Sequence, residues 1–199
     1  MSSTVLYMSM SLDGFIAGPN ETPENGLGDG GGRLHEWIMT GPPSDEGGIP
    51  ARPAGVDGEM MDEAMATGAV VAGLGTVEPA GYWGGDHHDG VPIFILSRHK
   101  TAADAEQWPL VTYVDDVATA MGRAKEAAGE RDVLVHGATV ARLALAASVL
   151  DEIQIHLIPV LFGEGRPLFE GIGTEQIQLE QTRVVEGDGV THLRYRVRR

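Results

Sequence analysis

The chain has 199 residues, of which 42% are hydrophobic and 22% charged, a composition typical of one globular α/β domain rather than of a disordered chain. Its formal net charge of -15, with only 14 Lys and Arg residues, argues against nucleic acid or an anionic membrane as the main partner. The sequence has no cysteine, which excludes disulfides, cysteine-ligated metal centres and thiol catalysis. No apolar run is long enough to predict a membrane span, and the first residues lack the layout of a signal peptide, so we expect a cytoplasmic protein.

The N-terminal part of the chain predicts one strand, two long loops and two helices. Residues 5–10 are a short apolar run and predict a buried strand that leads into the turn Leu12-Asp13-Gly14. Residues 18–32 and 41–55 are rich in Gly and Pro, so both segments are expected to be irregular. Loops of this length commonly serve as lids or binding loops.

The two expected helices of this part are short. Residues 33–39 place Leu34, Trp37 and Ile38 on one helical face. Asp57 is the expected N-cap of a helix that runs through Met65 and is ended by Gly68.

The rest of the chain alternates between strands and helices and then finishes with paired strands. The expected strands are residues 69–72, 91–96, 111–114, 132–135, 153–160, 176–180 and 190–197. A helix capped by Asp115 or Asp116 is expected to reach Ala128, and an alanine-rich helix should end near Ala147. This alternation predicts an α/β fold with a mixed, mostly parallel sheet flanked by helices on both faces, in three layers. Because neither a repeat nor a linker interrupts it, we expect one domain over residues 1–199.

Three turns that follow expected strands could bind phosphate. They are Gly73-Leu-Gly-Thr76, Leu96-Ser-Arg-His-Lys100 and His136-Gly-Ala-Thr139. At the carboxyl ends of parallel strands, such turns present free N–H groups of helix N-termini to a common crevice, where the helix dipole also favours an anion. Glycines at these junctions can equally be ordinary turn chemistry, and a full G-x-G-x-x-G fingerprint is absent.

The sequence resembles the RibD C-terminal-like family, the reductase half of the riboflavin-biosynthesis deaminase–reductases, which shares its fold with dihydrofolate reductase. The resemblance covers nearly the whole chain. It rests on four segments: Ser11-Leu-Asp-Gly-Phe-Ile-Ala-Gly18, Gly68-Ala-Val-Val-Ala-Gly-Leu-Gly-Thr76, residues 150–165 with Pro167-Leu-Phe169, and Gly189-Val-Thr-His-Leu-Arg-Tyr195. It implies a dihydrofolate-reductase-like fold, NADPH as cofactor and a homodimer.

The resemblance also implies where a cofactor and a substrate would bind. Ile16 and Ala17 would lie beside the nicotinamide, and Ser97 and Arg98 would take the adenosine end. The phosphate-binding positions would be Gly73, Leu74, Gly75, Thr76, His136, Gly137, Ala138, Thr139 and Val140. The substrate pocket would be walled by Trp37, Met60 and the loop that contains Leu161, Gly163 and Glu164. Asp13 is the candidate catalytic side chain, although it could instead cap its own turn.

Three departures from the family pattern affect the expected chemistry. Leu74 stands where the family has an arginine, and the loss of a charge-assisted hydrogen bond of roughly 1.5–3 kcal/mol would weaken NADPH binding or allow NADH instead. His136 stands where the family has the first glycine of a pair. Leu34 stands where dihydrofolate reductases have the carboxylate that binds the pterin, so folate reduction is disfavoured.

The sequence therefore favours an NADPH-dependent oxidoreductase that transfers a hydride to a small heterocyclic, imine or carbonyl substrate. It resembles 5-amino-6-(5-phosphoribosylamino)uracil reductase of riboflavin biosynthesis. The alternative is a nucleotide-binding or vestigial module with little turnover, as Leu74 would allow. Asp86-His-His-Asp89 is not expected to bind a metal, because adjacent side chains in a loop rarely converge on one ion. His156 is expected to be a hydrogen-bonded structural histidine.

Overall fold

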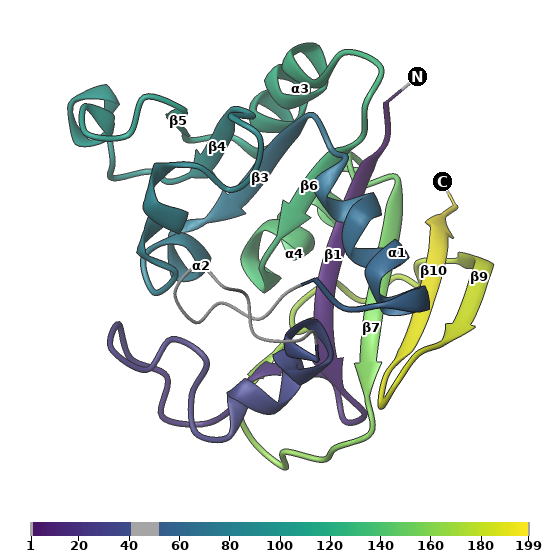
Figure 1. Cartoon of the computed structure of the whole chain (residues 1–199). Helices are drawn as coiled ribbons and strands as arrows, with labels where there is room; N and C mark the ends of the chain where they lie inside the picture. Colours follow the sequence, from purple (N-terminus) through teal and green to yellow (C-terminus); the bar gives the residue numbers. More distant parts are fainter. Residues whose placement is uncertain (1, 41–51, 199) are drawn as a thin grey trace.

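The computed structural model describes residues 2–40 and 52–198, and its centre is a sheet of eight strands (Figure 1). The strand order is β5-β4-β3-β6-β1-β7-β10-β9. Neighbouring strands from β5 to β7 are parallel, whereas β10 and β9 are antiparallel to their neighbours. The strands are β1 Thr4–Ser11, β3 Ala69–Gly73, β4 Ile93–Leu96, β5 Val111–Val114, β6 Val133–His136, β7 Glu152–Ile158, β9 Leu179–Glu186 and β10 Thr191–Val197. A separate pair joins β2 Phe15–Ala17 to β8 Arg166–Pro167.

Helices cover both faces of the sheet. The α-helices are α1 Gly55–Met65, α2 Leu74–Val77, α3 Val117–Ala128 and α4 Ala138–Ala146. The 3-10 helices are η1 Gly31–Met39, η2 Gly81–Gly85 and η3 Ala102–Ala105. Figure 1 shows α1 lying over β1 and β7.

The two faces of the sheet belong to different cores because side chains alternate along each strand. Leu6 of β1 packs with the buried faces of α3 and α4, together with Val71 and Val135 of the neighbouring strands. Val5 and Tyr7 point the other way, into a second cluster. This arrangement confirms the predicted three-layer, mostly parallel α/β fold.

A third, smaller hydrophobic cluster lies at the carboxyl end of β7. It joins Leu34 and Trp37 of η1 to Met60 of α1 and Ile158 of β7. The helical spacing of residues 33–39 therefore buries the predicted face, but as a 3-10 helix. Among the described residues, no helix is both long and apolar enough to span a membrane.

Some expected element boundaries were wrong. Helix α1 begins at Gly55 with Ala54 as its N-cap, and Asp57 lies inside the first turn. The Asp57 carboxylate is buried and contacts the ring of His192 on β10 instead of capping the helix. The strand expected at residues 176–180 is displaced to Leu179–Glu186. Of the second predicted loop, residues 41–51 lie outside the described part of the chain.

Candidate functional site

A cavity of about 1020 Å³ lies at the carboxyl ends of the parallel strands, between the sheet, η1 and α1. The turns after β3, β4 and β6 all reach it, which brings together three segments that are far apart in the sequence. Every residue expected to hold a cofactor lines this cavity: Ile16, Ala17, Gly73, Leu74, Gly75, Thr76, Ser97, Arg98, His136, Gly137, Ala138, Thr139 and Val140. A cavity of this size is at the upper end of the range for small-molecule sites.

Two of the glycine-containing turns are in contact at the N-terminus of helix α4. Gly137 has a φ of 94°, a conformation that disfavours other residues. A Cβ added to Gly137 would meet the Thr76 hydroxyl oxygen at 2.5 Å. The glycine therefore keeps the start of α4 open, where the first N–H groups of the helix have no intrahelical partner. A pyrophosphate would fit these backbone donors.

Three arginines line the cavity on the side of these turns: Arg98, Arg142 and Arg166. Arg98 is exposed at the end of β4. Arg166 of β8 places Nη1 3.5 Å from the position of a Cβ on Gly75, and its Nε donates to the Glu21 carboxylate at 2.6 Å. The turn that lacks an arginine at Leu74 thus has one beside it, supplied by a distant segment.

Ser97 holds its own turn in shape. Its hydroxyl oxygen accepts hydrogen bonds from the backbone N–H groups of His99 and Lys100, at 3.2 and 3.1 Å. Lys100 lies 4.0 Å from the carboxylates of both Glu78 and Asp104. Of the basic residues in the turn Leu96-Ser-Arg-His-Lys100, Arg98 and His99 line the cavity beside Ser97, whereas Lys100 does not.

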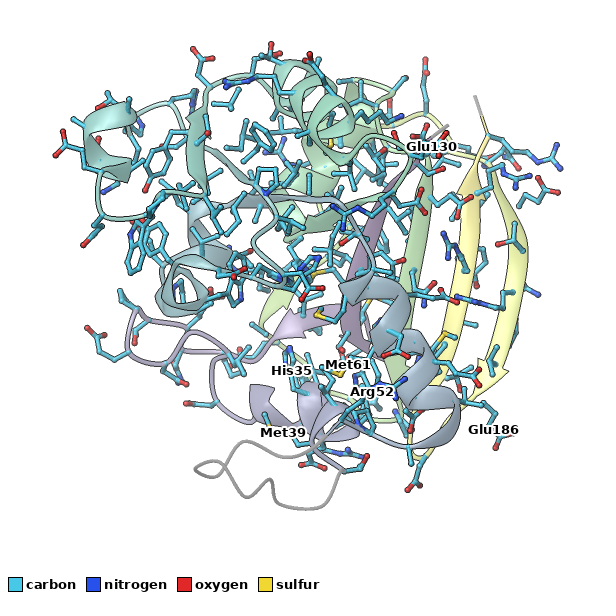
Figure 2. The ribbon with its side chains drawn as sticks, turned by 45° about the horizontal axis from the view of Figure 1, so that its top comes forward. His35, Met39, Arg52, Met61, Glu130 and Glu186 are labelled. Atoms are coloured by element: carbon cyan, nitrogen blue, oxygen red, sulfur yellow. The ribbon has the colours of Figure 1, made fainter. Side chains whose placement is uncertain are left out.

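The other end of the cavity is apolar and aromatic. Trp37 and Met60 line it as expected. They are only 5% and 3% exposed, so they belong both to the hydrophobic core and to the cavity wall. The Trp37 indole N–H donates to the Ser9 hydroxyl at 2.9 Å. His35 from η1 and Met61 from α1, both labelled in Figure 2, line the same end.

Among the described residues, neither η1 nor α1 adds a carboxylate or a cation to the cavity lining. Leu34 is fully buried, and Glu36 points outward into an ion pair with Arg33 at 2.8 Å. Among the described residues, the cavity's arginines are the three near the phosphate-binding turns. Arg52 is the first described residue after position 51. It is paired with the Asp62 carboxylate and does not line the cavity.

Histidines form much of the remaining wall, and burial keeps them neutral. Burial lowers the pKa of His87 to about 3 and that of His136 to about 4. Burial likewise lowers the pKa of His35, and it lowers the pKa of His156 well below its usual value. The cavity wall therefore presents uncharged imidazoles at neutral pH, which can donate or accept a hydrogen bond.

The four remaining predicted site residues do not line the cavity. The Asp13 carboxylate is exposed and accepts hydrogen bonds from the N–H groups of Phe162 and Gly163, at 3.0 and 2.8 Å, and from the Ser11 hydroxyl at 2.6 Å. The Ser11 hydrogen bond is the main cause of a lowered Asp13 pKa. Leu161 is 69% exposed, and Gly163 and Glu164 belong to the same outward loop. The Asp13 carboxylate therefore anchors the loop that contains Phe162 and Gly163, and its catalytic role stays a prediction.

His156 is hydrogen-bonded, as expected, but its partner is another histidine. The Nδ1 atoms of His156 on β7 and His192 on β10 lie 2.7 Å apart, and His192 Nε2 lies 2.8 Å from the Asp57 carboxylate. The His156 ring also packs against Trp37, with centroids 4.4 Å apart, and it lines the cavity.

The segment Asp86-His-His-Asp89 makes contacts of its own. The Asp86 carboxylate accepts the Gly90 N–H at 3.1 Å, and the Nδ1 atoms of His87 and His88 lie 2.7 Å apart. His88 Nε2 turns away toward Thr67, whereas His87 lines the cavity.

Several lining residues were not predicted from the sequence: Ser9, His35, Trp83, His87, His156 and Arg166. Strand alternation could have found Ser9, because it lies on the same strand face as Tyr7. Trp83 has a φ of 50° in a left-handed turn, a conformation uncommon for a bulky side chain. Nothing in the local sequence indicates that turn or the approach of Arg166 to Gly75.

One protein family matches the chain over nearly its whole length, and solved structures share its fold. The family model of the RibD C-terminal domain matches residues 3–193. No curated protein matches the chain by sequence. A putative riboflavin biosynthesis protein from Shewanella sp. PV-4 is similar in structure, with a TM-score of 0.69, 20% identity and 99% of each chain covered.

Two further structures share the fold. RibD from Acinetobacter baumannii aligns with a TM-score of 0.64 and 18% identity, over 100% of this chain and 59% of that one. Dihydrofolate reductase from Enterococcus faecalis, in complex with NADP(H), aligns with a TM-score of 0.56 and 15% identity, over 98% and 96% of the two chains.

Proposed function

Because the chain belongs to the RibD C-terminal domain family, we propose that it is an NADPH-dependent reductase of a small heterocyclic, imine or carbonyl compound. The observation that carries the proposal is the cavity itself: three strand-end turns and the β2 strand converge on one space of about 1020 Å³. When bound there, NADPH supplies a hydride from C4 of its nicotinamide ring.

The residues of this chain that would hold the cofactor divide into three groups. Ile16 and Ala17 are buried at the β2 strand, where backbone groups can bond a carboxamide. The open start of α4 beyond Gly137 offers N–H donors to a pyrophosphate. Ser97 and Arg98 lie at the end of β4, where they could take the adenosine portion. The Arg98 guanidinium, which pairs with no carboxylate of the described residues, suits a 2'-phosphate.

NADPH is preferred to NADH in this proposal, despite Leu74. Arg166 lies beside Gly75 and can supply to the phosphates the positive charge that Leu74 lacks. Its ion pair with Glu21 would orient the guanidinium while its Nη atoms remain available. NADH would bind the same turns but would leave Arg98 without an anionic partner.

The substrate end of the cavity favours an uncharged compound. Its described lining is aromatic, thioether and neutral imidazole, as given by Trp37, Met60 and His35. A phosphorylated ribosylaminopyrimidine needs a cation for its phosphate, so we propose a substrate without one. Folate is disfavoured because η1 offers Leu34 where a pterin-binding carboxylate would be needed.

A homodimer is also part of the proposal. The family resemblance implies it, and the outermost strand β9 exposes Leu179 and Val184, at 43% and 51%. An exposed strand edge with apolar side chains is a surface that a second copy could cover. Light scattering during gel filtration would give a mass near twice 21.1 kDa if the proposal is right, and a monomeric mass would exclude it.

A titration of NADPH into the protein is the first test. Trp37 and Trp83 line the cavity, so binding should quench tryptophan fluorescence and saturate. If no saturation occurs at millimolar NADPH, the proposed function is wrong. NADPH oxidation is then followed with a phosphorylated ribosylaminopyrimidine and with uncharged imines and ketones, and the proposal expects turnover only with the uncharged set.

The second candidate is a nucleotide-binding module with little turnover, which Leu74 in the first turn favours. Tight NADPH binding with no oxidation by either substrate set would support it against the enzyme.

A further inference from the structure

A row of polar side chains crosses the face of the sheet that η1 and α1 cover. Ser9 of β1 is paired in register with His156 of β7, and His156 is paired with His192 of β10. Asp57, from the first turn of α1, meets the far side of His192. His156, His192 and Asp57 are 5%, 1% and 5% exposed, so the three side chains form a chain that is shielded from water along its length.

The three groups are joined by two short contacts, and each contact needs one proton. His192 Nε2 must donate to the Asp57 carboxylate, 2.8 Å away, because an ionised carboxylate only accepts. The two Nδ1 atoms lie 2.7 Å apart, so one of them must donate a proton and the other must accept it with its lone pair. Two arrangements satisfy both contacts while His156 stays neutral, and they differ by a single proton.

In the first arrangement His192 is neutral and His156 donates through Nδ1, so His156 Nε2 is a bare acceptor. In the second, His192 carries protons on both nitrogens and donates to His156, which stays neutral and must then hold its own proton on Nε2. The positive charge of the second arrangement lies on His192, directly beside the Asp57 carboxylate. The Asp57 carboxylate also accepts a hydrogen bond from the Asp188 N–H at 3.2 Å.

His156 is the end of this chain that reaches the cavity. The described residues provide hydrogen-bond partners for its Nδ1 only. Trp37 fixes the ring plane from one side, with its own N–H anchored on Ser9. Burial lowers the pKa of His156 well below its usual value, which disfavours a charge on this ring but allows it to change tautomer.

We propose that Asp57, His192 and His156 form a proton relay, in which His156 Nε2–H is the proton donor to the substrate. The inference rests on the proposed function. Reduction of a C=N or C=O bond adds a hydride to carbon and a proton to nitrogen or oxygen, and the cofactor supplies only the hydride. The N–H bond at His156 Nε2 breaks, His156 Nδ1 takes the proton of His192 Nδ1, and His192 becomes neutral. The relay regains one proton from water after the product leaves.

The relay keeps the moving charge away from the substrate. A protonated His156 would put a cation into an apolar cavity end, whereas the second arrangement places the cation against a carboxylate. The charged and titratable groups that surround His156 act on the same equilibrium: His35 from η1, Asp57 from α1, His136 from β6, Arg183 from β9 and His192 from β10.

The relay can be tested by NMR of the whole protein labelled with ¹⁵N-histidine, with no ligand present. The proposal expects two changes to occur together: a second N–H on His192, and a switch of the single His156 proton from Nδ1 to Nε2. Asp57→Asn should abolish both changes. A titration in which His156 itself becomes doubly protonated, or in which neither ring changes, would overturn the proposal.

The kinetic test uses His156→Gln and Asp57→Asn with the substrate that turns over NADPH. Loss of a general acid is expected to lower kcat by about 100-fold or more, with the Kd for NADPH unchanged. Asp57→Asn should lower kcat and shift the pH profile. His88→Gln is the matched control, since His88 is buried and hydrogen-bonded to Thr67 outside the cavity wall. A His156→Gln enzyme with wild-type kcat and pH profile, and the wild-type unfolding temperature, would overturn the relay.

The two tests separate this inference from the proposed function. Absence of NADPH binding or of turnover would contradict the reductase while leaving the NMR result unaffected. Turnover that does not depend on His156 would contradict the relay while the reductase stands.

Discussion

The hydroxyl oxygen of Thr76 lies 2.5 Å from the position that a Cβ would take on Gly137. The turns after β3 and β6 are therefore in contact, and the contact depends on the absence of one methyl group. Gly137 also donates its N–H to the Met8 sulfur at 3.3 Å, so the turn is fixed from the sheet side as well.

Gly137→Ala should damage cofactor binding more than folding. Alanine at a φ of 94° is strained by about 1–3 kcal/mol, and its methyl group would push Thr76 away from the other turn. We expect a loss of NADPH affinity of at least tenfold and a lower urea midpoint. Gly122→Ala is the control: Gly122 lies inside α3 with open space around it, and alanine should stabilise a helix there by up to about 1 kcal/mol. Equal effects from both variants would show that Gly137 has no special role.

Arg166 should contribute to cofactor affinity because it stands beside the turn that contains Leu74. Arg166→Gln removes a charge-assisted hydrogen bond, and a loss of roughly 1.5–3 kcal/mol corresponds to about tenfold or more in the Kd for NADPH. Leu74→Arg should restore affinity in that background. Fluorescence titration gives both values. A Kd for NADPH that is the same in all three proteins would place the phosphates elsewhere.

Asp13 should matter for the loop it anchors and not for chemistry. Asp13→Asn weakens the acceptor of the Phe162 and Gly163 N–H groups, so amide hydrogen exchange should become faster in residues 161–165. We expect kcat within a few-fold of the wild-type value. A fall of 100-fold with unchanged exchange would instead assign Asp13 to the reacting centre.

Stability should decrease as the solution is made acidic, because of the cavity histidines. The pKa values of His87 and His136 in the folded protein are about 3 and about 4, below the value of about 6.5 in an unfolded chain. Between the folded and unfolded pKa values, the unfolded state binds more protons than the folded state. The contribution of these histidines to the free energy of unfolding is therefore fully present above about pH 6.5 and falls as pH decreases toward 4.

Each such histidine contributes a slope of at most about 1.4 kcal/mol per pH unit. Urea unfolding of His136→Gln at a series of pH values should give a smaller decrease than the wild-type protein over this window. A slope unchanged by the substitution would mean that the pKa of His136 is the same in the folded and unfolded states.

The sequence was informative where a feature is local. The alternation of strands and helices predicted the sheet, and the resemblance to the RibD C-terminal family is confirmed over residues 3–193. The turns at Gly73 and Gly137 were recognised because a strand followed by glycine and a helix is a short-range pattern. The cavity-facing positions of Trp37, Met60, Ile16 and Ala17 followed from the resemblance.

The sequence was not informative where a contact joins distant segments. His156 meets His192 only because β10 returns antiparallel beside β7 in one particular register, and nothing near either residue encodes that register. Asp57 looked like a helix cap because an acidic residue before an apolar run usually is one, yet the helix begins two residues earlier. The outward direction of the loop with Leu161 has a similar cause, since that loop is anchored by Asp13.

Strand β1 has a consequence for how relatives of this chain can differ in length. Met8 accepts a hydrogen bond from the α4 turn, and its neighbour Ser9 accepts one from Trp37. Because consecutive side chains of a strand point to opposite faces, an insertion or deletion of one residue in Thr4–Ser11 would exchange the two. We therefore expect gaps in alignments of related sequences to avoid this strand.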